Sequence, residues 1–201
     1  MKENLIITIS RQYGSGGREI GQKLAARLGI PYYDKELIIL AAEKSGYARS
    51  LFEEADQKAS NSMIFSLMRA GSMANSYDMP LNDKIYLIQS GVIQQVARQG
   101  SCVIVGRCAD YILQERRDCF HVFIAGELKD RAARVIEEHG ISAAAARSHV
   151  KDRDRRRSSY YKHITDQVWG MAANYDLCLN SSKLGIDRCV ELILAATYMD
   201  S

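Results

Sequence analysis

The chain has 201 residues, of which 47% are hydrophobic and 25% charged, and its formal net charge is +3. This composition is typical of a globular protein and allows one domain with a substantial core and room for a small inserted subdomain. The net charge is too small to indicate nucleic-acid binding by itself. No apolar run approaches the length of a membrane span, and Met1–Asn4 lead directly into a predicted strand, so we expect neither a membrane segment nor a signal peptide.

Five cysteines are present, an odd number, and none has C-x-x-C spacing. Three of them lie in or beside predicted buried strands. We therefore expect reduced thiols and a cytoplasmic protein.

A strand, a tight loop and a helix are predicted at the start of the chain. The apolar run Ile6–Ile9 predicts the strand, the glycines of Gly14-Ser15-Gly16-Gly17 predict the loop, and the stripe of Ile20, Leu24 and Leu28 predicts the helix. Glycines let backbone N–H groups approach a phosphate, and the N-terminus of the helix adds a partial positive charge. The glycine cluster follows directly after the first predicted strand, and this position indicates phosphate binding. A glycine-rich turn without a ligand is the alternative.

The loop departs from the common phosphate-loop pattern G-x-x-x-x-G-K-[ST]. Its second glycine corresponds to Gly16, but the leading glycine is Arg11 and the lysine is Gly17. The hydroxyl residue that usually binds magnesium is Arg18, or Glu19 in a loop one residue longer. A dinucleotide fingerprint fits less well, because Glu19 stands where its third glycine belongs.

The next segments predict a short strand, a helix and a region of different composition. Pro31–Asp34 predicts the strand, and Asp34 can cap a helix over Lys35–Lys44. Residues 47–81 lack a clear strand pattern and are rich in Ser, Asn and Met. We interpret 47–81 as a helical insertion, with plain connecting helices as the alternative.

The rest of the chain alternates helices and strands. The expected elements are a helix that Asn82 or Asp83 caps and Gly100 ends, a strand over Cys102–Val105, a strand over Phe120–Ala125, a helix over Glu127–His139, a helix capped by Ser142 and running towards Trp169, a strand over Tyr175–Asn180, and a helix with Ile186, Val190, Ile193 and Leu194 on one face. This alternation predicts an α/β domain with a parallel sheet. Ligands of such sheets bind at the carboxyl ends of the strands. Gly14–Glu19, Asp34, Gly106-Arg107 and the segment after Ala125 should therefore converge.

A basic run, Lys151–Arg157, lies on the helix that follows Ser142. Spacing of four places Arg153 and Arg157 on one face. Most such runs are solvated helix surfaces, but this one follows the fourth strand and its helix and can fold over the strand ends. Nucleic-acid binding is the weaker functional alternative, because acids interrupt the run.

Four features together resemble the P-loop nucleoside-monophosphate kinases, most closely the cytidylate kinase-like group. They are Ile7-Thr8-Ile9 leading into Gly14-Ser15-Gly16, Gly106-Arg107 after the third strand, Arg131 with Arg134 after the fourth, and Asp152-Arg153-Asp154-Arg155 with Arg157. The resemblance covers nearly the whole chain. It implies a P-loop NTPase fold with a five-stranded parallel sheet flanked by helices, a helical acceptor-binding insertion at 47–81 and an arginine-rich lid region at 142–168.

The resemblance also implies roles for individual residues. The expected ATP-binding residues are Arg11, Gly14, Ser15, Gly16, Gly17, Arg18, Glu19 and Arg131. The expected acceptor-binding residues are Asp34, Arg107 and Asp154. Arg153 and Arg157 would contact the transferring phosphoryl group, Arg18 or Arg11 would replace the missing lysine, and Glu19 would help to bind Mg²⁺.

The leading functional hypothesis is a kinase that transfers the γ-phosphoryl group of ATP, with Mg²⁺, to a nucleoside monophosphate or similar acceptor. The second is a nucleotide-binding module that has lost catalysis and switches a partner. The lid arginines favour the first, whereas Gly17 and Val105, which replace the expected lysine and acid, favour the second. Cys108 also replaces the Asp that follows Gly-Arg in typical cytidylate kinases. The sequence indicates neither the acceptor nor the oligomeric state.

Overall fold

Five parallel strands form the centre of the molecule in the computed structural model, which describes residues 4–45 and 81–199. Their order in the sheet is β2-β3-β1-β4-β5. The strands are β1 (Ile6–Arg11), β2 (Tyr32–Tyr33), β3 (Cys102–Val105), β4 (Cys119–Ala125) and β5 (Leu177–Asn180). The predicted parallel sheet is confirmed, and β2 and β5 are shorter than the sequence pattern indicated.

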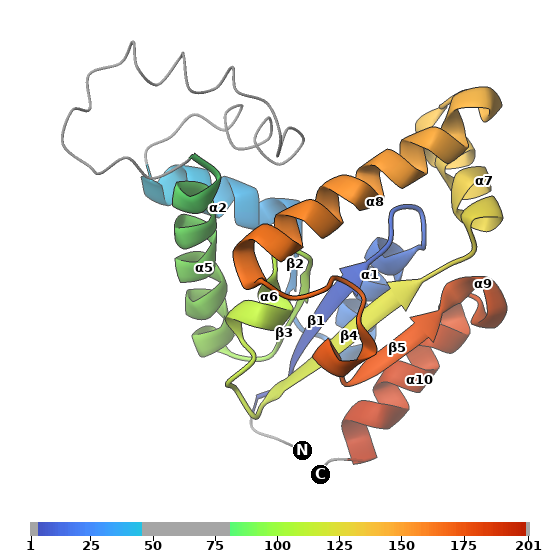
Figure 1. Ribbon diagram of the computed structural model, residues 1–201. Coiled ribbons are helices and arrows are strands. Elements are labelled where there is room, and N and C mark those ends of the chain that lie inside the picture. The colour runs from blue at the N-terminus through green and yellow to red at the C-terminus, as the bar shows by residue number, and fades with distance from the viewer. Residues whose placement is uncertain (1–3, 46–80, 200–201) are drawn as a thin grey trace.

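Helices cover both faces of this sheet (Figure 1). They are α1 (Gly17–Leu28), α2 (Lys35–Ser45), α5 (Leu81–Gln99), α6 (Ala109–Ile112), α7 (Leu128–His139), α8 (Ala143–Thr165), α9 (Ser181–Leu184) and α10 (Ile186–Met199), with a 3₁₀ turn η1 (Ala172–Asn174). The short elements α6, α9 and η1 were not predicted, because segments of three or four residues carry no readable hydrophobic period.

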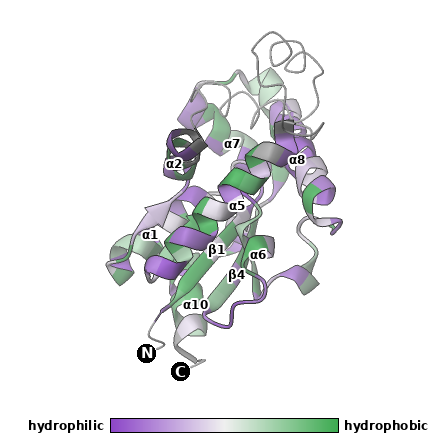
Figure 2. Ribbon diagram, turned by 90° about the vertical axis from the view of Figure 1, so that its left-hand side faces the viewer, coloured by the Kyte–Doolittle hydropathy of each residue, from purple (hydrophilic) through white to green (hydrophobic). Residues whose placement is uncertain are grey.

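Two hydrophobic cores follow from the alternation of side chains along the strands. Ile7 and Ile9 of β1 pack with residues of α1 and α10 on one face, whereas Ile6 packs with residues of α2, α5 and α6 on the other. The strands are accordingly the hydrophobic centre of the molecule in Figure 2. The face that carries Ile6 continues along β1 with the buried polar residues Thr8 and Ser10. This polar part of the face is linked to α8 rather than to an apolar helix, because Ser10 and Tyr161 of α8 both donate to Asp110.

α7 and α8 form a pair that lies across the carboxyl ends of the central strands (Figure 1). Ala132 and Val135 of α7 pack against Ala146 and Val150 of α8. The predicted helix after Ser142 is confirmed as α8, which stops four residues short of Trp169. α8 ends at Thr165, because Asp166 adopts a left-handed conformation with φ of 56° and its N–H donates to the carbonyl of Lys162.

The proposed insertion at 47–81 lies outside the described residues, apart from Leu81, which begins α5. All five cysteines are described, and all are free thiols. In the described ranges, no helix combines the length and apolar character needed to cross a membrane.

Candidate phosphate-binding site

The loop between β1 and α1 presents an uncapped helix N-terminus. Gly14 and Gly16 have φ values of 75° and 76°, a region that favours glycine, and no side chain of the described residues caps α1. A Cβ atom on Gly14 would lie 2.6 Å from the carbonyl oxygen of Arg131, so the loop also needs glycine for close packing against α7. The first N–H groups of a helix have no intrahelical acceptors. The loop therefore has the backbone donors and the helix polarity of an anion site.

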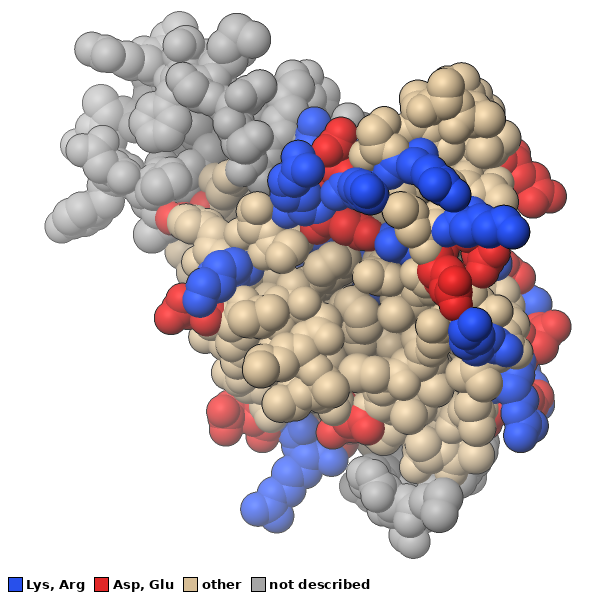
Figure 3. All heavy atoms as spheres, turned by 45° about the vertical axis from the view of Figure 1, so that its right-hand side comes forward, with Lys and Arg blue, Asp and Glu red and all other residues tan. Residues whose placement is uncertain are grey.

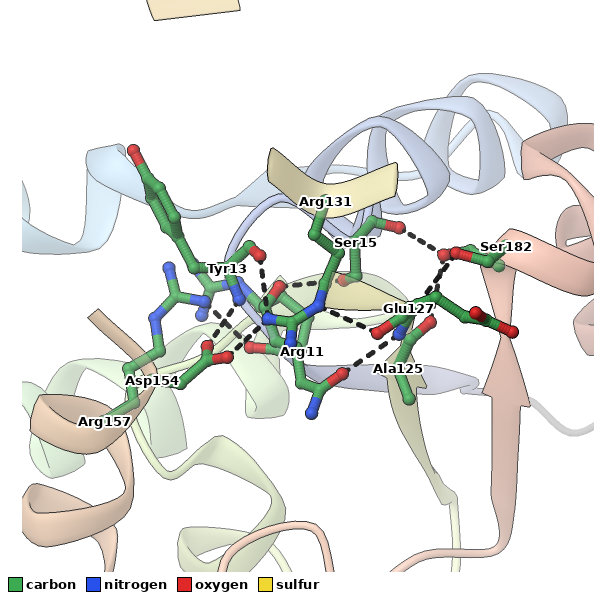
Figure 4. Close-up of polar contacts among 12 residues, drawn as sticks. Arg11, Tyr13, Ser15, Ala125, Glu127, Arg131, Asp154, Arg157 and Ser182 are labelled. Carbon is green, nitrogen blue, oxygen red and sulfur yellow. Dashed lines mark hydrogen bonds and ion pairs between the residues drawn. The ribbon is translucent and has the colours of Figure 1, made fainter. Parts of the chain in front are cut away.

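Hydrogen bonds hold the loop to neighbouring strands and helices (Figure 4). The Ser15 hydroxyl donates to the carbonyl of Gln12 at 2.8 Å, and the Ser181 hydroxyl donates to the carbonyl of Ser15 at 2.7 Å. The amide oxygen of Gln12 accepts from the N–H of Gly126 at 3.0 Å. β1, the start of α9 and the end of β4 thus fix the loop before any ligand arrives.

Arg131 and Asp154 bind both sides of the Tyr13 backbone (Figure 4). The N–H of Tyr13 donates to Asp154 Oδ1 at 2.7 Å, and Arg131 Nη1 donates to the Tyr13 carbonyl at 3.2 Å. Arg131 also pairs with Asp154 and donates from Nε to the carbonyl of Gly126 at 2.8 Å. Both residues, predicted from the resemblance as ligand-binding, here hold the loop; their direct contact with nucleotides stays a prediction.

The lid arginines gather around the Tyr13 ring. The guanidinium carbons of Arg153 and Arg157 lie 5.6 and 5.3 Å from its centroid, distances suited to cation–π attraction. Arg157 Nη1 also donates to the carbonyl of Arg11 at 2.8 Å. The predicted common face of Arg153 and Arg157 is confirmed, and it points at the loop.

Arg11 and Arg18 meet at the buried carboxylate of Asp34. Arg18 reaches Asp34 Oδ2 at 2.7 Å from both Nε and Nη2, and Arg11 Nη2 lies 3.4 Å from Oδ1. Partial burial lowers the pKa of Arg18, but the charge and hydrogen bond of Asp34 outweigh it and raise that pKa above its ordinary value. Asp34 thus pairs with two arginines at the end of β2; its roles as a helix cap and as an acceptor ligand stay predictions.

Arg11 also occupies the space in which a loop lysine would begin. A Cβ atom on Gly17 would lie 2.6 Å from Cβ and 2.9 Å from Cγ of Arg11. The two departures from the common pattern are therefore linked: Arg11, in place of the leading glycine, fills the space that is open because Gly17 stands in place of the lysine. The guanidinium of Arg11 continues to Gly106, where its Nη1 would lie 1.9 Å from an added Cβ. The φ of 78° at Gly106 is the stronger reason for glycine there, because the end of the Arg11 side chain could move aside.

Arg134 has no individual role in the sequence-based prediction, yet it lies over the loop. Its Nη1 would lie 2.4 Å from a Cβ on Gly16, and it is 3.5 Å from Glu19 Oε2. Glu19 Oε1 is also 3.2 Å from Lys23 Nζ. The signal that could have identified Arg134 is its spacing of three from Arg131, which places both on one side of α7.

The end of β3 lies beside Arg11. Gly106, Arg107 and Cys108 have successive φ values of 78°, 61° and 54°, a left-handed run that is unusual for the two residues with side chains. Arg107 is half-buried, and burial raises the pKa of the Cys108 thiol, which keeps that thiol neutral. The predicted convergence of this segment with the glycine loop is confirmed through Arg11.

Arginines from four elements thus surround the carboxyl edge of the sheet: Arg11, Arg18, Arg131, Arg134, Arg153 and Arg157. Figure 3 shows basic side chains, with acids among them, along the top and right of this view, and others at its left and lower edges. An uncapped glycine loop at the carboxyl edge of a 2-3-1-4-5 parallel sheet, with arginines above it, defines the class of P-loop kinase folds.

The comparisons with known proteins agree with this class. The model of the Cytidylate kinase-like family matches residues 6–183, and the chain belongs to that family. A protein named cytidylate kinase from Pyrococcus horikoshii is 22% identical over 97% of this chain and 89% of its own length, and one from Pyrobaculum calidifontis is 25% identical over 94% and 91%.

Solved structures show the same fold. An uncharacterized protein from Eubacterium ventriosum has a TM-score of 0.75 at 29% identity, covering 98% of this chain and 99% of its own. Shikimate kinase from Bacteroides thetaiotaomicron has a TM-score of 0.52 at 13% identity, covering 96% and 97%, which is a likeness of fold alone.

Proposed function

We propose that this protein is an ATP-dependent phosphotransferase whose acceptor is a nucleoside monophosphate or a similar small phosphorylated compound. Membership of the Cytidylate kinase-like family and the kinase names of its relatives support this class of reaction. The observation that carries the proposal is the uncapped glycine-rich N-terminus of α1 with six arginines from four elements around it. Phosphoryl transfer depends on positioning and on positive charge rather than on covalent chemistry by the protein.

The donor phosphates would bind the N–H groups at the start of α1, with the guanidinium of Arg134 beside Gly16. Arg153 and Arg157 would leave the Tyr13 ring and meet the transferring phosphoryl group, which the small energy of a cation–π contact allows. The carboxyl ends of β2 and β3, where Arg11 and Arg18 meet Asp34 and Arg107 follows β3, would receive the acceptor. The excess of arginine there favours an anionic acceptor.

The described residues of this chain do not form a Mg²⁺ site by themselves. Among them, no three His, Cys, Asp or Glu side chains are grouped to hold a metal ion. The Glu19 carboxylate already pairs with Lys23 and Arg134. Magnesium would therefore arrive bound to ATP phosphates and keep most of its waters, with Glu19 in the first turn of α1 as the candidate protein carboxylate.

The test is a panel of phosphorylated acceptors with ATP and Mg²⁺, scored for ADP release. With the acceptor so identified, Arg153→Ala and Arg157→Ala should each lower kcat by about 10³-fold or more, whereas ATP affinity should change far less. Arg155→Ala is the matched control, because Arg155 lies on the same helix but is 76% exposed and pairs with Asp152 at the surface.

Two outcomes would contradict the kinase proposal. Unchanged turnover in both Arg153→Ala and Arg157→Ala would remove the lid role. A wild-type protein that binds ATP but turns over no acceptor would favour the nucleotide-binding module, a function that needs neither arginine for phosphoryl transfer.

A further inference from the structure

A buried carboxyl group joins β1, α6 and α8 away from the glycine loop. Asp110 is 4% exposed, and its Oδ2 accepts a hydrogen bond from the Tyr161 hydroxyl at 2.7 Å. Its Oδ1 accepts from the Ser10 hydroxyl at 3.3 Å. Tyr161 belongs to α8 and is itself 3% exposed. A buried carboxyl with two hydroxyl donors from different elements is a strong geometric constraint.

The inner face of α8 contacts β1 and the loop at three successive levels. Asp154 accepts from the N–H of Tyr13, Arg157 donates to the carbonyl of Arg11, and Tyr161 reaches Ser10 through Asp110. These three α8 residues are spaced by three and four, so they lie along one side of the helix. The helix is rigid over this length, and the position of Tyr161 therefore affects where Arg157 and Asp154 meet the loop.

The hydroxyl of Tyr161 links the last turns of α8 to the sheet, because it donates to Asp110, which also accepts from Ser10 of β1. The other buried residue of these turns is Thr165, whose hydroxyl donates back to the carbonyl of Tyr161 at 2.7 Å within the same helix. The apolar contacts of α8 with α7 involve Ala146 and Val150, in its N-terminal half. Packing therefore fixes the N-terminal half of α8, and polar contacts fix the other end: the Asp110 hydrogen bond in the interior and a contact of His163 with Asp83 of α5, at 2.8 Å, on the surface.

We propose that Asp110 and Tyr161 are positioning residues, which set the register of α8 on β1 and thereby place Arg153 and Arg157 for phosphoryl transfer. The catalytic part of this inference rests on the proposed function; the positioning part does not. A polar cavity of about 240 Å³, also lined by Tyr111 and His121, adjoins the pair.

The first test needs no activity. The amide hydrogen of Tyr13 is held by Asp154, so its exchange rate reports the register of α8. Tyr161→Phe removes only the hydroxyl and should accelerate exchange at Tyr13 about tenfold, the upper end of what loss of one hydrogen bond costs. Tyr111→Phe is the matched control, since it removes a hydroxyl from the same cavity, and should leave the rate unchanged.

A conservative variant separates this hydrogen bond from general loosening. Asp110→Asn keeps an oxygen that accepts from Tyr161, so exchange at Tyr13 should stay within about threefold of wild type. Equal acceleration in Asp110→Asn and Tyr161→Phe would overturn the proposal. Unchanged exchange in Tyr161→Phe would also overturn it.

The second test is kinetic. With an acceptor from the panel, Tyr161→Phe should lower kcat about tenfold and leave the KM for ATP within about twofold. In a background that lacks both lid arginines, Arg153→Ala with Arg157→Ala, the same substitution should have no further effect, because its action passes through these two arginines. A full tenfold effect in that background would overturn the positioning role. If no acceptor is turned over, the proposed function fails, and the exchange experiment still decides the register.

Discussion

This chain has Arg11 and Gly17 where the common phosphate-loop pattern has glycine and lysine. The close packing of these two residues gives a specific prediction about stability. Gly17→Lys adds a Cβ atom 2.6 Å from Cβ of Arg11, and both atoms are tied to backbone rather than to flexible side-chain ends. We expect this variant to be destabilised when Arg11 is present. The double variant Arg11→Gly with Gly17→Lys, which recreates the common loop pattern, should not suffer the clash.

The magnitude follows from two opposing effects. Overpacking of this kind costs about 1–3 kcal/mol, whereas replacing glycine at a helical position gains up to about 1 kcal/mol. Gly17→Lys alone should therefore lower the free energy of unfolding by about 0–3 kcal/mol. In the Arg11→Gly background only the gain remains, so the coupling energy of the pair should be about 1–3 kcal/mol.

The assay is urea unfolding of wild type, both single variants and the double variant. A change of about 1 kcal/mol should also move Tm by about 2–4 °C in a chain of this size. Gly91→Lys is the control for helix propensity, because a Cβ atom there meets nothing within 4 Å. Additive effects of the Arg11 and Gly17 substitutions would refute the shared-space argument.

Three further predictions concern single residues. Gly14→Ala should lower the free energy of unfolding by about 2–4 kcal/mol, because φ is 75° and the added Cβ would lie 2.6 Å from the Arg131 carbonyl oxygen; wild-type stability in urea would show that the loop is not held against α7. Glu19→Gln should weaken the Mg²⁺ dependence of ATP binding more than ATP affinity, measured by titration calorimetry, and equal dependence would leave Glu19 as a favourable acid in the first turn of α1. Burial raises the pKa of Asp110, so the stability linked to its protonated form is present at low pH and lost as pH rises through the raised pKa. The free energy of unfolding should therefore fall less from about pH 4 to about pH 8 in Asp110→Asn than in wild type. The same fall in both proteins would contradict the raised pKa of Asp110.

The elements that can be predicted from the sequence are those with a hydrophobic period. The apolar runs Ile6–Ile9 and Cys102–Val105 and the stripe through Ile20 identify β1, β3 and α1 without knowledge of their tertiary contacts. Local spacing also places Arg153 and Arg157 on one face of a helix. Short elements such as α6 are missed, since four residues contain barely one helical turn.

The site was predicted in outline, because parallel strands place their carboxyl ends at one edge whatever the side chains are. That rule brought the glycine loop, Asp34 and Gly106 together, as the structure shows through Arg11. It did not indicate Arg134, whose place over Gly16 depends on how closely α7 approaches the loop. The hydrophobic period of a helix or strand shows which of its faces is buried, but not how closely it packs against another element.

The sequence by itself determined the strand–loop–helix order, the parallel sheet and the family resemblance, because each depends on residues close together in the chain. Only the tertiary structure decided which partners the long polar side chains take. Arg18 pairs with Asp34, Arg131 pairs with Asp154, and Tyr161 reaches Asp110 across a separation of 51 residues. An arginine or a tyrosine can reach many neighbours, and the one that it binds is selected by the packing of helices on the sheet.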